Sequence, residues 1–513
     1  MSVYAFIDVS KKQQFIYKSN ELKCNLYNSL IIKAVTEDTG VESLDFLKIF
    51  LSEHLEKFFR EKYSFVYSGG GNSIIKFPSV DIVHNFIESY SSEILKYHPS
   101  LELYISFVDE DEEELRNITD NEEKERKIRK LLYKRSDELK DSRKSKFRRV
   151  TYGVEKINDE GEPEELGINN GRFECVKENK DYKKARDYLY NSLEVRLKNS
   201  NIKITSELTE YKKSNGDNSY IGVIAIDGNK MGQMVETMKS FENLKQFSKA
   251  ISQIYEEAVI KALTEYSRKY DTEGTMFITP IVMAGDDICI IVKAKGAIEI
   301  AAGIIKEIQE LSKKIKKGNR ILNAAMKDDE YLTACGGAAI VRAGYPFFEA
   351  VTIAEKLCDN AKESIYESGE EKVGSFIDWK IIQGATVERI SLDENLRHDN
   401  YIENFHIKPL KINISKSNSN SICDYDSFLD AVSKIKASIK DESISTSMIE
   451  GIRQVMYSGK ESYSIYFDTK DRIEKLVDII EKSFSIKLIH GLYQQEKNFT
   501  YIFNDIINVL KYI

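Results

Sequence analysis

Three aspartates lie where their carboxylates could hold divalent metal ions. Asp227 ends one apolar run, and the adjacent Asp286 and Asp287 separate two further apolar runs. Phosphoryl transfer asks little covalent chemistry of a protein, but it needs divalent cations that clamp the triphosphate and activate the attacking hydroxyl. These cations prefer oxygen ligands. We therefore predict that the three aspartates are metal ligands and catalytic groups of a nucleotidyl transfer site with two Mg²⁺ or Mn²⁺ ions. The competing interpretation is a plain turn, since Gly-Asp-Asp and Asp-Gly-Asn are common loop sequences.

Glycines flank the acids at points where a phosphate would need access to the backbone. Gly285 allows a metal or phosphate to approach the main chain, and Gly228 and Gly232 would offer N–H groups to phosphate oxygens. Asn229 lies between these two glycines. We regard these four residues as candidate nucleotide-binding positions.

Two further positions are candidate nucleotide contacts, each with a structural alternative. Lys362 lies at the end of a predicted helix, where its ammonium could reach a triphosphate or simply complement the helix dipole. Gly69, Gly70 and Gly71, followed by Asn72, could cradle a second nucleotide through backbone N–H groups or merely permit a tight hairpin.

The elements predicted around the acids follow the order strand, helix, two strands, helix, strand, with one more helix after them. In this layout the first strand lies beside the hairpin, so the acids should meet at one edge of a sheet. Apolar periodicity places the elements at Ile221–Ile226, Phe241–Tyr266, Met276–Met283, Ile288–Val292, Ala297–Lys316, Leu332–Val341 and Phe347–Ser364. This order is typical of a ferredoxin-like palm.

The same order recurs near the N-terminus. The elements predicted there are Val3–Asp8, helical residues up to 60, Tyr63–Tyr67, Ile74–Phe77, Val80–Tyr97 and Leu101–Phe107. The strand-end aspartate and the hairpin glycine are 62 residues apart in this copy (Asp8 to Gly70) and 58 in the other (Asp227 to Gly285). The repeat predicts two related palms. Only the second hairpin carries two acids, so we expect the first palm to be degenerate.

The whole chain is predicted to be an α+β protein of several domains, because 513 residues exceed what a single core usually holds. The predicted parts are a first palm (1–108), a charged and mainly helical insert (109–219), a second, catalytic palm (220–385) and a C-terminal helical domain (386–513). The C-terminal helices are expected at Ser427–Lys440, Ile449–Tyr457, Arg472–Phe484 and Phe499–Ile513.

Composition limits the classes of function. A net charge of −8 gives no general attraction to nucleic acid, so RNA contact would need a local patch such as the basic run at 124–149, unless that run is only a solvated helix. The six cysteines form no C-x-x-C pair, which argues against a zinc ribbon or a disulfide framework. No apolar run is long enough to span a membrane, and we expect a cytoplasmic protein without membrane contact.

These motifs together resemble the large polymerase/cyclase subunit of type III CRISPR effector complexes, which is related to GGDEF nucleotide cyclases. The first palm is similar in the segment from Tyr4 to Ser10, which includes Asp8, and in the Gly69–Asn72 hairpin. The second palm is similar at Asp227–Gly232, at Gly285–Asp287, at Thr333–Ala339 and at Ala354–Lys362.

The resemblance implies a catalytic second palm that makes cyclic oligoadenylates from ATP, while the first palm supplies the other nucleotide pocket. It implies gating by target RNA bound to a guide-RNA complex. By analogy, Lys362 touches the triphosphate and Gly70, Gly71 and Asn72 approach the acceptor nucleotide. Asp8 and Ser10 are assigned to the same nucleotide site.

The sequence departs from the family in three ways. Ala284 stands where the family usually has glycine, a small change that we expect to be tolerated. The family often begins with an HD nuclease domain, but this chain enters its first palm at residue 3, so we expect no DNA cleavage. The zinc-binding cysteine cluster between the palms is missing, with only Cys175 left there.

Two alternatives stay open at this point. The same palm chemistry could make a cyclic dinucleotide or join AMP to a small metabolite. A protein of another class, a non-catalytic RNA-binding scaffold, would not need three acids at one sheet edge, since carboxylates without metals raise each other's pKa.

Overall fold

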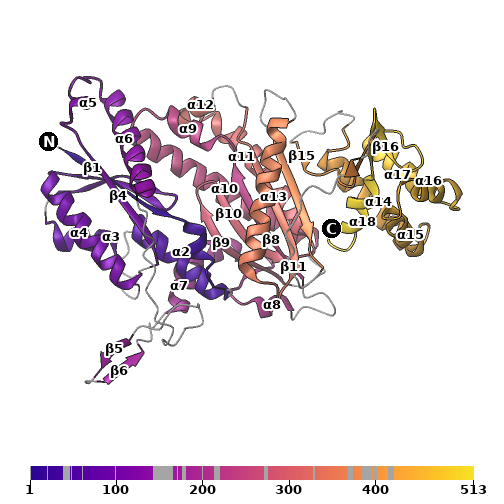
Figure 1. Cartoon of the computed structure of the whole chain (residues 1–513), viewed down its shortest axis with the longest axis horizontal. Helices are drawn as coiled ribbons and strands as arrows, with labels where there is room; N and C mark the ends of the chain where they lie inside the picture. The colour runs from indigo at the N-terminus through magenta and orange to yellow at the C-terminus, as the bar shows by residue number, and fades with distance from the viewer. Residues whose placement is uncertain are drawn as a thin grey trace.

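The fold is seen in a computed structural model of the chain (Figure 1). The structure describes residues 2–19, 21–38, 47, 49–60, 62–98, 100–142, 166–169, 172–175, 181–198, 200–212, 220–270, 275–326, 330–367, 374–383, 396–397, 401–413 and 421–513.

The first palm is built on a four-stranded antiparallel sheet with the strand order β2-β3-β1-β4. Helices follow β1 and β3 along the chain, whereas β2 and β3 form a hairpin. Alternate residues of β1, such as Ala5 and Ile7, pack in one core with residues of α2 and α4. The elements are β1 (Val3–Ser10), α1 (Lys12–Ile16), α2 (Leu22–Thr36), α3 (Leu51–Phe58), β2 (Ser64–Gly69), β3 (Asn72–Phe77), α4 (Val80–Tyr97) and β4 (Glu102–Asp109).

The second palm contributes five strands, β8 to β12, to a seven-stranded sheet with the order β15-β12-β11-β8-β10-β9-β7. Within it, β11-β8-β10-β9 repeats the order β4-β1-β3-β2 of the first palm, which is the ferredoxin-like order. The elements are β8 (Tyr220–Gly228), α9 (Met231–Thr237), α10 (Phe241–Lys269), β9 (Met276–Ala284), β10 (Asp287–Lys293), α11 (Ala297–Lys316), α12 (Arg320–Ala325), β11 (Ala334–Arg342), α13 (Phe347–Glu367) and β12 (Ser375–Ile381). The predicted double-palm fold is confirmed.

The two palms share one hydrophobic core. On one face of the second sheet, Val223 and Ile291 pack with α13 and with residues of the first palm such as Leu30 and Ile31 of α2. Tyr17 of the first palm meets Phe347 at the start of α13 edge to face, with ring centroids 5.9 Å apart. The palms therefore lie side by side around a continuous interior (Figure 1).

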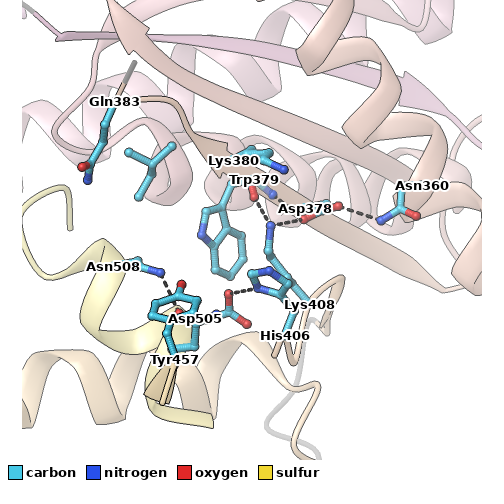
Figure 2. Close-up of a pocket in the computed structure, with 12 residues that line it drawn as sticks. Asn360, Asp378, Trp379, Lys380, Gln383, His406, Lys408, Tyr457, Asp505 and Asn508 are labelled. Atoms are coloured by element: carbon cyan, nitrogen blue, oxygen red, sulfur yellow. Dashed lines mark hydrogen bonds and ion pairs between the residues drawn. The ribbon is translucent and has the colours of Figure 1, made fainter. Parts of the chain in front are cut away.

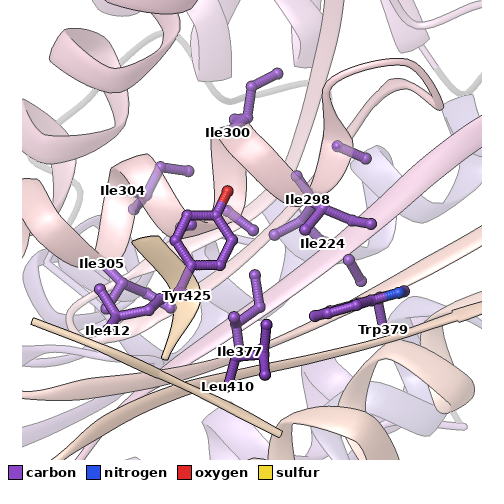
Figure 3. Packing of buried hydrophobic residues seen from close by; sticks show 14 of the residues in the cluster. Ile224, Ile298, Ile300, Ile304, Ile305, Ile377, Trp379, Leu410, Ile412 and Tyr425 are labelled. Atoms are coloured by element: carbon purple, nitrogen blue, oxygen red, sulfur yellow. The ribbon is translucent and has the colours of Figure 1, made fainter. Parts of the chain in front are cut away.

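The other face of the second sheet is covered by α10 and α11. Ile224, Ile298 and Ile305 lie in this second core, which continues into the C-terminal region through Leu410 and Tyr425 (Figure 3). The outer face of the first sheet is covered by α6 (Asn121–Ser142) of the insert and by the start of α10.

The insert between the palms contacts both of them. Its helices α5 (Glu113–Arg116) and α6 follow the first palm, and β7 (Ile202–Ile204) pairs in parallel with β9 and so completes the second sheet. The remaining elements are β5 (Leu166–Asn169), β6 (Arg172–Cys175), α7 (Tyr182–Leu197) and α8 (Leu208–Lys212). Residues 124–142 of the basic run at 124–149 lie on α6, whereas 143–149 fall outside the described residues.

The C-terminal region is mainly helical, as predicted, but it also contains a small sheet of the order β13-β14-β17-β16 that the sequence analysis missed. Strands of two or three residues leave no readable alternation. Helix α16 was also missed. The elements are β13 (Leu396–Arg397), β14 (Ile402–Asn404), β15 (Leu410–Ile412), α14 (Tyr425–Lys440), α15 (Thr446–Met456), α16 (Lys460–Thr469), α17 (Glu474–Phe484), β16 (Tyr493–Gln495), β17 (Asn498–Thr500) and α18 (Ile502–Val509).

Among the described residues, none of the helices has the length and apolar character needed to cross a membrane.

Candidate active site

The three predicted acids meet at one edge of the second sheet. Asp227 lies next to last in β8, and Asp287 begins the neighbouring strand β10. The pairing of Ile288 with Ile226 brings Asp287 opposite Asp227, and the carboxyl groups of Asp286 and Asp227 lie within hydrogen-bonding reach. Gly285 forms the turn with a φ of +66°, a left-handed backbone that favours glycine.

The hairpin carboxyl groups are held in a setting that disfavours negative charge. Burial and the charge of Asp227 raise the pKa of Asp286 to about 6, and Lys362 opposes this rise. Burial, Asp227 and Asp286 raise the pKa of Asp287 to about 7. The surface of Asp287 is nevertheless exposed, so solvent in the site screens part of this effect. The site therefore carries more acidic than basic groups.

Lys362 supplies one cation to this edge. It lies on α13, and its ammonium pairs with the Asp227 carboxylate and lies 3.5 Å from the carbonyl oxygen of Gly228. The lysine is five residues from the end of the helix, so its ammonium is committed to Asp227 and not to the last helical carbonyls. Among the described residues, the side chains do not form a group of three or more His, Cys, Asp and Glu arranged to hold a metal ion. Asp227 is turned toward Lys362 instead.

Two further acidic residues, Glu355 and Asp359, lie near the three aspartates. Burial and Asp287 raise the pKa of Glu355 to about 7, and burial also raises the pKa of Asp359. Both residues lie on α13, Glu355 two turns and Asp359 one turn before Lys362. Sequence reasoning assigned them no role, although their spacing of four residues on one predicted helix face was readable.

The first-palm hairpin has the same register as the second. Gly69 pairs with Asn72 across its turn as Ala284 pairs with Asp287, and Asn72 lies opposite Asp8. Asn72 therefore takes the place of Asp287, Gly71 that of Asp286 and Asp8 that of Asp227. The first palm keeps one acid of three.

The remaining first-palm acid is neutralised by two lysines. The Asp8 carboxylate pairs with the ammonium of Lys12 at 3.1 Å and with that of Lys140 on α6 at 2.9 Å. Lys12 also donates to the carbonyl oxygen of Gly70 at 3.3 Å, and its charge lowers the pKa of Asp287 in the second palm. Lys12 thus lies between the two hairpins. Ser10 is two residues beyond Asp8, at the end of β1.

The glycine hairpin rests against the second palm. Gly70 and Gly71 have φ values of +65° and +73°, and the Gly71 N–H donates to the Glu37 carboxylate at 2.7 Å. A Cβ atom on Gly69 would lie 3.1 Å from the hydroxyl of Ser248 on α10. The first-palm hairpin therefore lies close to α10 of the second palm.

The loop after Asp227 is partly structural. The side-chain amide of Asn229 donates to the Thr333 hydroxyl at 3.2 Å and to the carbonyl oxygen of Gly374 at 3.1 Å, which ties β8 to the neighbouring strands. Gly228 has no room for a side chain, whereas Gly232 in α9 has open space around it.

The residues present fit a divalent cation. Carboxylates are the hard oxygen ligands that such ions prefer. Burial first, and then the negative charge of Asp227, raise the pKa values of Asp286 and Asp287, and a bound cation would offset that charge.

A cavity of about 200 Å³ lies elsewhere, between the second palm and the C-terminal region (Figure 2). β15 pairs only with Ser375–Ile377, so the edge of β12 is open beyond this point. There the Asp378 carboxylate accepts from the Trp379 N–H at 2.7 Å and pairs with Lys408 at 3.2 Å, and Asp505 accepts from His406 at 2.7 Å. The buried acids of this cavity thus cap a strand edge and join two parts of the chain.

Two ferredoxin-like palms, one with acids at its hairpin, define a nucleotidyl transferase-like fold. The sequence of residues 220–368 matches the family model of the second palm domain of Cas10/Cmr2. This segment is therefore similar to a palm domain of that family. No curated protein matches the chain in sequence.

Solved structures share the fold. The chain is similar to the Csm1-Csm4 cassette in complex with cA4, with a TM-score of 0.53, and to the cassette in complex with pppApApA, with a TM-score of 0.52. Each comparison covers 99% of this chain and 69% of the other at 12% sequence identity. At this identity, the likeness shows the fold that the chains have in common.

Proposed function

We propose that this protein is a metal-dependent nucleotidyl transferase that makes a cyclic oligoadenylate from ATP in a type III CRISPR-like antiviral system. The observation that carries the proposal is the matched register of the two hairpins. One presents Asp286 and Asp287 beside Asp227, and the other presents Gly71 and Asn72 at the corresponding positions beside Asp8. Such an arrangement suits a donor nucleotide at the acids and an acceptor at the glycines.

Asp227, Asp286 and Asp287 would hold two Mg²⁺ or Mn²⁺ ions. When bound, these ions supply charge neutralisation for the triphosphate and lower the pKa of the attacking 3′-hydroxyl. Lys362 would leave Asp227 for the triphosphate, because phosphate oxygens carry more charge than one carboxylate. Gly70, Gly71 and Asn72 would place the acceptor through backbone N–H groups, with the Gly71 N–H released by Glu37. Pyrophosphate leaves as the 3′-oxygen bonds to the α-phosphorus.

The partners proposed are guide RNA and target RNA within a multi-subunit effector complex, with target RNA gating the synthesis. The shared fold with the Csm1-Csm4 cassette, whose ligands in two structures are cA4 and pppApApA, supports this assignment. The basic residues of α6 are a candidate RNA contact, although Arg135 pairs with Glu112 at 2.6 Å and Arg129 is buried.

The test is product analysis. The purified chain, alone and with its co-expressed partner subunits and guide–target RNA, is incubated with ATP and Mg²⁺ or Mn²⁺, and products are identified by mass spectrometry. We expect cyclic oligoadenylates that are absent with the double variant Asp286→Ala, Asp287→Ala. Absence of pyrophosphate release under every condition would overturn the proposal and favour an RNA-binding scaffold.

A second candidate differs only in the acceptor. A cyclic dinucleotide or an AMP–metabolite conjugate would use the same acids, so the mass of the product decides between them. A product that contains a non-adenylate acceptor and needs no RNA would favour this candidate.

A further inference from the structure

A buried tyrosine that the proposed mechanism does not use lies beneath the acids. Tyr255 projects from α10 and has 1% of its surface exposed. Within the described part of the chain, its hydroxyl has no hydrogen-bond partner. Buried hydroxyls without partners are uncommon in folded proteins, and each calls for an explanation.

The position of the hydroxyl points to the acid site. A Cβ atom on Gly228 would lie 2.7 Å from it, so the hydroxyl reaches the backbone directly after Asp227. Burial and then the charges of Asp286 and Asp227 raise the pKa of Tyr255. Gly228 thus leaves the space through which the hydroxyl approaches the end of β8.

The present pairing of Asp227 explains why the hydroxyl is unpartnered. The Asp227 carboxylate is drawn to Lys362 on α13, away from α10. If Lys362 moves to a triphosphate, as the proposed function requires, Asp227 loses this partner and the pair of carboxylates is free to reorient. The Tyr255 hydroxyl, which lies beside Gly228, is then available to donate to this pair.

We propose that Tyr255 is a positioning residue that donates a hydrogen bond to the Asp286–Asp227 carboxylate pair when divalent cations are bound, and that Lys362 and Tyr255 are alternative partners of this pair. The inference rests on the proposed function, because it gives Tyr255 the role of orienting the same acids. Groups that hydrogen-bond to metal ligands fix the ligand orientation, and their loss typically weakens metal binding about 10- to 100-fold.

The test measures Mn²⁺ affinity of the full chain by electron paramagnetic resonance or calorimetry, without relying on turnover. We expect Tyr255→Phe to raise the Kd for Mn²⁺ about 10-fold or more, with thermal stability in EDTA unchanged or increased. Tyr425→Phe is the matched control, because Tyr425 also has a buried, unpartnered hydroxyl but lies in the core beside α11, away from the acids. This control should leave the Kd unchanged.

The outcomes separate the two proposals. Wild-type protein that binds Mn²⁺ in a manner lost in Asp286→Ala, together with an unchanged Kd in Tyr255→Phe, would overturn the role of Tyr255 alone. Wild-type protein without Asp286-dependent Mn²⁺ binding would overturn the metal site and the tyrosine's role with it. Equal weakening by Tyr255→Phe and Tyr425→Phe would show a general packing effect and would also reject the inference.

Discussion

At the scale of single residues, charge balance explains the arrangement of the acid site. Asp286 and Asp287 crowd against Asp227 with one nearby lysine in the second palm and one, Lys12, from the first. Like charges held close at a partly buried edge cost free energy that a bound cation would recover. Under the proposed function a metal ion would supply this charge, whereas in the structure Lys362 pairs with Asp227.

The pH dependence of stability tests this picture. The pKa values of Asp286 and Asp287 lie above the usual 3.8, so the folded protein holds protons that the unfolded chain has already released. The contribution of these two carboxyl groups to the free energy of unfolding is fully present below about pH 4, and it is lost as the pH rises through 6 and 7. In EDTA, we expect the melting temperature of Asp287→Asn to fall less than that of wild type between pH 5 and 8. The exposed Asp471→Asn serves as a control, and parallel curves for all three proteins would contradict the prediction.

A lysine substitution tests the same charge balance through activity. Because Lys362 lowers the pKa of Asp286 and Asp287, Lys362→Met should move the acidic limb of the pH–rate profile to higher pH. Loss of a charged hydrogen bond of about 1.5–3 kcal/mol should also lower kcat/KM roughly 10- to 100-fold. Lys356→Met changes an exposed lysine on the same helix and should do neither. A lower rate with an unmoved profile would mean that Lys362 acts on substrate alone.

At the scale of elements, close packing of α13 on β11 sets the position of Lys362. A Cβ atom on Gly337 would lie 2.0 Å from the Ala354 carbonyl oxygen and 2.5 Å from the Cys358 nitrogen, both backbone atoms of α13. The helix can approach the sheet this closely only over glycine.

Two neighbouring glycines make a matched pair for testing this contact. Gly337→Ala must displace α13, so we expect a loss of about 1–3 kcal/mol of stability or more, and a loss of activity. At Gly336 the nearest atoms are the side-chain ends of Ile305 and Ile226, at 3.1 and 3.3 Å, so Gly336→Ala should cost less. Chemical denaturation of both variants gives the comparison, and equal losses would argue against the helix contact.

At the scale of the whole molecule, the two palms form one interior with a shared core. Residues of α2 pack on the second sheet, β7 of the insert completes that sheet, and the Tyr190 hydroxyl donates to the carbonyl oxygen of Pro280.

Producing the protein as two fragments, divided between residues 212 and 220, tests whether the two palms share one core. We expect the two fragments to co-purify after co-expression, because each buries apolar surface of the other. The fragment 220–513 alone should bind a hydrophobic dye and precipitate. A soluble, cooperatively folded 220–513 fragment with the melting temperature of the intact chain would contradict a shared core.

The sequence by itself determined the local elements and the repeat. The helix predicted at Ala297–Lys316 has the observed ends, and the hairpins flank Gly70 and Gly285, because apolar periodicity and turn residues are properties of short windows. It missed α16, whose aromatic and β-branched residues are weak helix formers, and the short strands of the C-terminal region. The assignment of the site residues to metal and nucleotide stays a prediction.

Only the tertiary structure decided which groups meet at the site. Lys12 and Asp287 are far apart in sequence and belong to different palms, and nothing local in either segment encodes their approach. The same holds for Lys362 with Asp227, and for Tyr255 beneath Gly228. Partners of this kind depend on how strands pair and helices pack across the whole chain, so they appear only once the shared core has brought the two palms together.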